Sequence, residues 1–201
     1  MGHGAGRVED LIARLTAQPV TRLVDVRTAP ASRKHPQFGK EALAASLSRA
    51  GIAYEWAPDL GGWRRPSKDS PHTALRSDAF RGYADHMATP AFRRALAHVL
   101  GRAEEGPTAV LCAESLWWRC HRSLLADAAT VAGCEVRHIL PDSRVEGHRL
   151  RPTARVVDGA LVYDRPEGVR PRSSATRPPR PTPALQPSPA APPRRTPQGA
   201  R

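Results

Sequence analysis

The chain has 201 residues, of which 25% are charged, and a formal net charge of +12 at pH 7. Three cysteines, an odd number, do not make a disulfide framework, so we expect a cytoplasmic protein. The sequence has no apolar run of signal-peptide or membrane-span length, which argues against secreted and membrane-spanning classes and against a membrane partner.

The basic charge is distributed unevenly. Residues 165–201 contain 11 of the 21 prolines and eight arginines but a single acid, Glu167, which leaves a net charge of about +5 on residues 1–164. A proline-rich segment with few apolar residues cannot bury enough surface to fold. The sequence therefore predicts one domain over 1–164 and a disordered Pro/Arg-rich tail over 165–201.

Hydrophobic periodicity and turn residues predict a regular succession of elements within the domain. In chain order, we expect a helix over 7–17, a strand over 23–27, a helix over 40–50, a strand over 52–56, a long polar loop from Gly61 to about Asp78, a helix that begins at Pro90, a strand over 108–112, a helix over 120–132, a strand over 136–140 and a hairpin over 156–163. The Asp158-Gly159 pair is typical of a hairpin turn.

Alternating strands and helices are typical of right-handed βαβ units. The sequence therefore predicts a single three-layer α/β domain with a mainly parallel sheet, helices on both faces and a C-terminal β-hairpin. In such sheets ligands bind beyond the carboxyl ends of the strands, so candidate site residues are sought there.

Arginines follow several of these strand ends. Arg27, Arg33 and Arg122 are candidate ligands for a phosphate or carboxylate group, because arginine binds planar anions through two hydrogen bonds. The alternative is that they form salt bridges with Asp25 or Glu114 that stabilise the fold. Both interpretations stay open at the sequence level.

The catalytic candidates, Glu114, Cys112 and His121, lie at or after the end of the strand over 108–112. Glu114 follows that strand and could act as a general base or bind a ribose hydroxyl. Cys112 and Cys120 are candidate thiols, and a helix start beside His121 and Arg122 would lower the pKa of Cys120. Buried structural cysteines are the alternative.

Metal ligands are not indicated by spacing. Cys112, Cys120, His121 and His138 are suitable ligand types but lack the close CxxC or HxxxH spacing of readable zinc sites. We therefore assign no metal, and the sequence indicates no particular cofactor.

Several short blocks occur in a characteristic order along the chain. The blocks are Asp25-Val26-Arg27 with Ser32-Arg33 and Pro36-Gln37-Phe38, Gly51-Ile52 with Tyr54 and Leu60-Gly61-Gly62, Phe80 to Ala84, Cys112-Ala113-Glu114, Cys120-His121-Arg122, His138-Ile139-Leu140 and His148-Arg149-Leu150. Together they resemble the domain of unknown function 488 family. The resemblance implies a compact α/β fold but no established activity. It also implies a strand ahead of Gly2-His3-Gly4, so we expect either a lost edge strand or a misassigned start.

Three functions are consistent with these features. The first is a pocket, formed by Arg27, Arg33, Arg122, Asp25, Tyr54 and Cys120, that binds or acts on a phosphate-bearing small molecule, a nucleotide or a nucleic-acid end. The second is non-catalytic nucleic-acid binding through the basic charge. The third is a structural or adaptor domain. The sequence predicts neither the reaction nor the oligomeric state.

Overall fold

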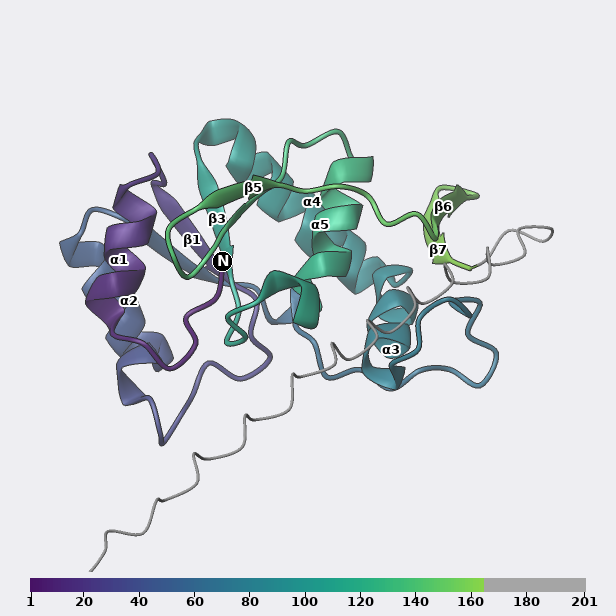
Figure 1. Ribbon diagram of the computed structural model, residues 1–201, viewed down its shortest axis with the longest axis horizontal. Helices are drawn as coiled ribbons and strands as arrows, with labels where there is room; N and C mark the ends of the chain where they lie inside the picture. Colours follow the sequence, from purple (N-terminus) through teal and green to yellow (C-terminus); the bar gives the residue numbers. More distant parts are fainter. Residues whose placement is uncertain (165–201) are drawn as a thin grey trace, which may run out of the picture. The chain divides into compact units, whose positions relative to one another are not determined.

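A computed structural model describes residues 1–164; the tail predicted to be disordered lies outside the described residues. The elements are α1 (Val8–Thr16), β1 (Arg22–Asp25), α2 (Lys40–Arg49), β2 (Ala53–Trp56), α3 (Asp78–Met87), α4 (Pro90–Glu105), β3 (Thr108–Leu111), α5 (Arg122–Val131), β4 (Arg137–Ile139), β5 (Val145–Gly147), β6 (Ala154–Val157) and β7 (Ala160–Tyr163) (Figure 1). Short 3₁₀ helices lie between some of these elements: η1 (Pro36–Phe38), η2 (Pro58–Leu60) and η3 (Trp117–Arg119).

The central sheet has three parallel strands in the order β2-β1-β3. Val24 of β1 lies opposite Glu55 of β2 and Val110 of β3. The chain crosses from β1 to β2 through α2 and reaches β3 through α3 and α4. This arrangement confirms the predicted mixed α/β fold with a parallel sheet, and it places the ends of β1, β2 and β3 at one edge.

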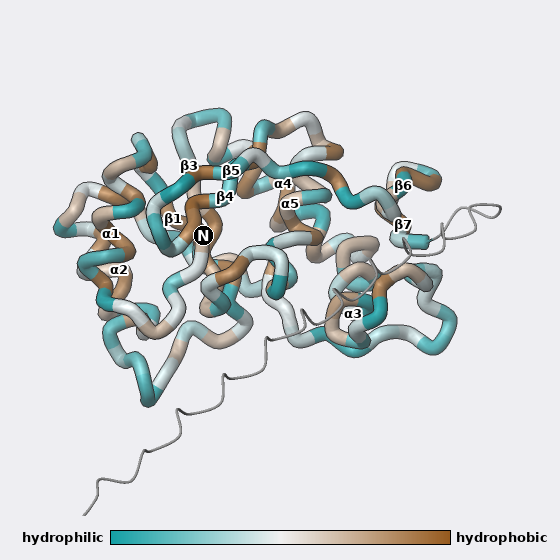
Figure 2. Tube along the Cα trace, in the orientation of Figure 1, coloured by the Kyte–Doolittle hydropathy of each residue, from teal (hydrophilic) through white to brown (hydrophobic). Residues whose placement is uncertain are grey.

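Alternate strand residues pack into two cores, one on each face of the sheet. Leu23 and Leu111 belong to a core with α1 and α2, whereas Val24 and Cys112 belong to a core with residues of α3, α4 and α5. Figure 2 shows the hydropathy along these segments. Helices therefore cover both faces, because successive residues of a strand point to opposite sides.

The strand predicted over 136–140 is confirmed as β4, but its partner was not predicted. β4 pairs antiparallel with β5, at a tight turn in which Ser143 donates its amide N–H to the carbonyl of Leu140. The predicted hairpin is confirmed as β6 and β7. Asp158 and Gly159 have φ of 48° and 76°, the left-handed values of a type I′ turn.

A helix absent from the prediction, α3, follows the long polar loop. Phe80, Tyr83, Ala84 and Met87 lie on one face of α3 at helical spacing and pack into the core of α4 and α5. The sequence does contain this apolar pattern, so the helix could have been predicted.

Residues 1–4 run beside β3. Gly2 forms a parallel bridge with Cys112, and His3 donates its amide N–H to the carbonyl of Cys112 at 3.1 Å. A Cβ at Gly2 would lie 1.9 Å from the carbonyl oxygen of Glu114, so a larger residue cannot approach this closely. The segment thus fills part of a sheet edge and brings His3 toward the end of β1. Within residues 1–164, no helix is long and apolar enough to cross a membrane.

Candidate functional site

Asp25 and Arg27 form a buried ion pair at the end of β1. The carboxylate of Asp25 accepts hydrogen bonds from Arg27 Nε at 2.8 Å and from the Arg27 backbone N–H at 3.0 Å. It also accepts one from the Tyr54 hydroxyl at 2.9 Å. The side chain of Asp25 is 0% exposed and that of Arg27 7%. The structure therefore brings three predicted site residues together, with the charge of Arg27 neutralised by Asp25.

The surroundings of Arg27 fix its orientation further. Arg27 Nη1 lies 3.3 Å from His3 Nε2, and the His3 ring stacks on Phe38 with centroids 4.1 Å apart. Trp56 donates its indole N–H to the carbonyl oxygen of Arg27 at 2.9 Å. Burial lowers the pKa of His3 to about 4, so its ring is neutral at pH 7, and burial raises the pKa of Tyr54. These contacts favour the fold-stabilising interpretation of Arg27.

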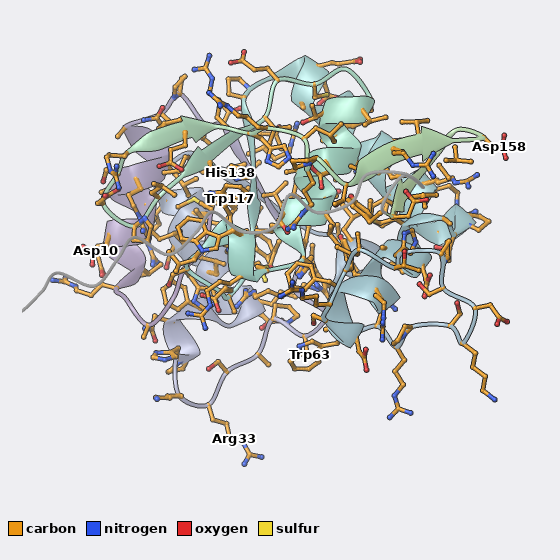
Figure 3. All side chains as sticks on the ribbon, turned by 45° about the vertical axis from the view of Figure 1, so that its right-hand side comes forward. Asp10, Arg33, Trp63, Trp117, His138 and Asp158 are labelled. Carbon is orange, nitrogen blue, oxygen red and sulfur yellow. The ribbon has the colours of Figure 1, made fainter. Side chains whose placement is uncertain are left out.

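Two other predicted site residues, Arg33 of the predicted pocket and the catalytic candidate Glu114, face solvent. Figure 3 shows Arg33 pointing away from the body of the domain, and its residue is exposed. The carboxylate of Glu114 is also exposed and accepts the amide N–H of Leu116 at 3.3 Å. Glu114 reaches Arg122 only through its backbone carbonyl, to which Arg122 Nη2 donates. The salt bridge expected between the Glu114 side chain and an arginine is absent from the described residues, because the carboxylate turns back onto its own loop.

A second cluster is formed by two cysteines and a histidine. Cys112 follows β3, and Cys120 and His121 immediately precede α5. Their sulfur and ring-nitrogen atoms all lie within 4.8 Å of one another. Cys120 Sγ is 3.5 Å from His121 Nδ1 and accepts a hydrogen bond from Arg122 Nε at 3.4 Å. Four of the predicted site residues therefore converge between β3 and α5.

The two thiols have opposite electrostatic environments. The thiol of Cys112 hydrogen-bonds to Cys120, and this contact, together with His121 and Arg122, lowers the pKa of Cys120 to about 3 despite its burial. The same hydrogen bond and burial raise the pKa of Cys112. These surroundings favour the thiolate form at Cys120 and the protonated form at Cys112. Cys134, the third free cysteine, is part-exposed beyond the end of α5.

Buried polar atoms without a partner occur in the segment that contains Cys120. Arg122 is only 4% exposed, yet its Nη1 has no hydrogen-bond partner among residues 1–164. The same is true of Trp117 Nε1 and His121 Nε2. Three of the seven buried side-chain nitrogen and oxygen atoms without a partner in the described domain thus lie within residues 117–122. Buried polar groups are normally paired, so this concentration makes the segment the candidate ligand site.

The loop after η2 packs against the thiol cluster. A Cβ at Gly62 would lie 2.8 Å from His121 Nδ1, and the Tyr83 ring lies 4.9 Å from the His121 ring, centroid to centroid. Gly62 therefore permits the backbone to cover His121 closely. A shallow surface depression of about 460 Å³ lies elsewhere, over α2 and β2, and among the predicted site residues it is lined by Tyr54 alone. None of the residues that line this depression carries a charge. The thiol cluster, which contains Arg122 and two thiols, is therefore the stronger candidate for binding an ion.

Sequence reasoning missed a buried polar chain on the inner face of α5. Asp127 Oδ1 lies 2.9 Å from His148 Nε2, and His148 Nδ1 lies 2.9 Å from His138 Nε2. Because the carboxylate only accepts, His148 donates to Asp127 and accepts from His138. Tyr163 also donates its hydroxyl to Asp127 at 3.1 Å. The one indication of this chain in the sequence was Asp127, which lies on the inward face of the helix predicted over 120–132.

This polar chain ends beside the unpaired donors. The His138 ring stacks on Trp117 with centroids 3.8 Å apart, and Figure 3 shows the two side chains side by side. Burial lowers the pKa of His138 to about 3, so that ring is neutral. Asp127 thus connects α5 to Tyr163 of β7, and through His148 it positions the His138 ring on which Trp117 stacks.

The fold and the cluster define the class: an α/β protein with a buried thiol pair and an arginine at the carboxyl edge of a parallel sheet. A family model described as "Domain of unknown function DUF488" matches residues 7–129, more than half of the chain, and the chain belongs to this family. The match includes β1, β2, β3 and the whole thiol cluster. Comparison with curated proteins and with solved structures gave no match.

Proposed function

We propose that this protein binds a phosphate-bearing small molecule between β3 and α5, with its anionic group at Arg122. The observation that carries the proposal is the unpaired Nη1 of Arg122, a buried group that can only donate. Trp117 Nε1, five residues earlier in the chain, is a second buried donor without a partner among residues 1–164. Leaving a buried charged donor without an acceptor is costly, and an anion oxygen would remove that cost.

Arg122 suits this role better than the other predicted arginines. Arg27 already forms a two-point ion pair with Asp25, whereas no carboxylate lies within ion-pair distance of Arg122 in the described domain. Arg122 also belongs to the first turn of α5, a helix of ten residues. The amides of Ser123, Leu124 and Leu125 already donate to the carbonyls of Cys120 and His121, so α5 favours an anion here through its dipole and not through free amide groups.

Cys120 Sγ lies beside the proposed anion site, where it accepts a hydrogen bond from Arg122 Nε and its surroundings favour the thiolate. Its negative charge partly offsets that of the guanidinium, so an anion must compete with it. Arg122 has separate nitrogens for the two tasks: Nε and Nη2 hold Cys120 and the Glu114 carbonyl, and Nη1 is left for the ligand.

The proposal is tested by thermal unfolding in the presence of inorganic phosphate, sugar phosphates and nucleotides. A ligand at 100 times its dissociation constant should stabilise the folded chain by about 2.7 kcal/mol. The variant Arg122→Lys keeps the charge but lacks the forked geometry, and it should lose most of this stabilisation. The matched control is Arg119→Lys, because Arg119 is exposed on η3, three residues away.

Equal ligand-induced stabilisation in Arg122→Lys and wild type would refute the proposed site. Loss of stabilisation in the Arg119 variant alone would move the anion contact to the exposed face of η3. Each outcome is readable without knowledge of the natural ligand.

A further inference from the structure

We propose that Cys112, Cys120 and His121 bind a divalent metal ion of the zinc type, with the fourth coordination position facing the anion held by Arg122. The inference rests on the proposed function only for that fourth ligand. The three protein ligands are argued from their own geometry.

The positions of the donor atoms suit a tetrahedral ion. Zinc–sulfur bonds of about 2.3 Å and zinc–nitrogen bonds of about 2.0–2.1 Å place ligand atoms about 3.5–3.8 Å apart. Cys120 Sγ and His121 Nδ1 are already 3.5 Å apart, and no two of the three donor atoms are separated by more than 4.8 Å. A displacement of about 1 Å would therefore complete the three-ligand set.

The chemistry of the donors selects a soft or borderline ion. Two thiolates and one imidazole form the Cys₂His set that zinc uses where a fourth position is open to water or substrate. Carboxylate-preferring ions such as Mg²⁺ and Ca²⁺ are disfavoured by sulfur ligands. The eight-residue separation of Cys112 and Cys120 hid this set at the sequence level, and η3 closes the loop that joins them.

Charge and hydrogen bonding connect the metal to the anion. Two thiolates neutralise a divalent ion, so the Arg122 guanidinium leaves the loaded cluster with a net charge of about +1, which favours an anionic fourth ligand. Coordination through Nδ1 would also fix the proton of His121 on Nε2. The unpaired His121 Nε2 would then become a donor, as Arg122 Nη1 and Trp117 Nε1 already are.

The test is titration of the reduced, untagged full chain with Co²⁺ and then Zn²⁺. One equivalent of Co²⁺ should produce thiolate-to-cobalt charge-transfer absorption and the d–d bands of tetrahedral cobalt, and Zn²⁺ should displace it. Because thiols lose their protons on coordination, uptake should weaken as the pH falls. Cys120→Ser and Cys112→Ser should each weaken Zn²⁺ binding by at least about 100-fold.

Cys134→Ser is the matched control, since Cys134 is a free cysteine outside the cluster, and it should bind both ions like wild type. Zinc content and the rise in melting temperature on adding Zn²⁺ to wild type provide a second readout if a cysteine variant does not fold. Absence of stoichiometric binding to the wild-type chain would overturn the inference, as would tetrahedral cobalt absorption that survives in Cys120→Ser.

The two proposals fail in different ways. If the chain does not bind cobalt but is stabilised by phosphate, the metal site is rejected and the anion site is kept. Tetrahedral cobalt absorption that phosphate does not perturb, in a chain that phosphate does not stabilise, would keep the metal and reject the anion.

Discussion

Arg27 and Arg122 both lie at the carboxyl edge of the sheet, and each is less than a tenth exposed. They differ in the charge beside them. Asp25 holds Arg27 through its backbone and side chain, whereas Arg122 donates to a sulfur and a carbonyl and keeps one nitrogen unpaired. The first arrangement is complete within the described domain, and the second calls for an acceptor.

Removing one partner of the buried Arg27–Asp25 ion pair should destabilise the fold strongly. Replacing Arg27 with methionine leaves the Asp25 carboxylate buried and unpaired, so we predict that Arg27→Met lowers the free energy of unfolding by about 3–5 kcal/mol in urea at pH 7. Arg33→Met, at an exposed position, should change it by no more than about 0.5 kcal/mol. An Arg27→Met protein that is fully stable but no longer binds phosphate would assign Arg27 to the ligand instead.

At the scale of the elements, two helical glycines have contrasting surroundings. A Cβ at Gly82 in α3 would lie 2.4 Å from the carbonyl oxygen of Arg64, whereas a Cβ at Gly101 in α4 would meet nothing within 4 Å. Gly82 therefore allows the polar loop to cross α3 closely, and Gly101 has no comparable contact.

The same substitution should thus have opposite effects in the two helices. Gly101→Ala should raise the free energy of unfolding by about 0.5–1 kcal/mol, because alanine loses less conformational freedom than glycine. Gly82→Ala should lower it by about 1–3 kcal/mol, since a backbone carbonyl must move. Chemical denaturation of the two variants provides the comparison, and stabilisation by Gly82→Ala would show that the loop does not rest on α3.

The elements also show what sequence reasoning can reach. Apolar periodicity was sufficient for α1, α2, α4, α5 and the three parallel strands, because each has one face or both faces in a core. Periodicity could not reveal that β4 pairs with β5, a matter of chain reversal at Ser143. It also could not assign partners to arginines at neighbouring strand ends, because side-chain pairing depends on distances of a few ångströms between segments far apart in the sequence.

For the candidate site, the wide spacing of the two cysteines in the sequence gave no indication that they are in contact. Cys112 and Cys120 were recognised as candidate thiols, but their contact arises only when β3 and α5 meet through η3. Asp127, His138 and His148 likewise combine three separate segments, and their order in the chain gives no sign of the hydrogen bonds that join them.

For the whole molecule, the charge is divided between two regions. About +7 of the net +12 lies on residues 165–201, outside the described residues. Nucleic-acid binding through this charge stays a prediction. The anion site proposed here uses a different and much smaller part of the charge, one buried guanidinium between β3 and α5.

The stability of the domain should fall on acidification because buried rings are held neutral. Burial lowers the pKa of His138 to about 3 and that of His3 to about 4, below the ordinary value of 6.5. Below pH 6.5 the unfolded chain therefore binds protons that the folded chain does not, and stability decreases by up to about 1.4 kcal/mol per pH unit for each ring. The loss of stability should level off only when the pH approaches the folded-state pKa values of His3 and His138.

Urea unfolding between pH 7 and pH 4.5 tests this expectation. His138→Gln retains a donor for His148 but cannot titrate, so its stability should fall less steeply than that of wild type. Val156→Gln is the control, because Val156 is 54% exposed and has no titratable group, and it should keep the wild-type slope. A wild-type slope in His138→Gln would contradict the assignment.

The central claim, that Arg122 holds an anion between β3 and α5, is tested most directly by anomalous diffraction from crystals of the full chain soaked in tungstate, a heavy phosphate analogue. We predict an anomalous peak within hydrogen-bond distance of Arg122 Nη1, beside the start of α5, that disappears in Arg122→Lys crystals of the same form. Peaks confined to exposed arginines such as Arg33, with none at Arg122, would contradict it.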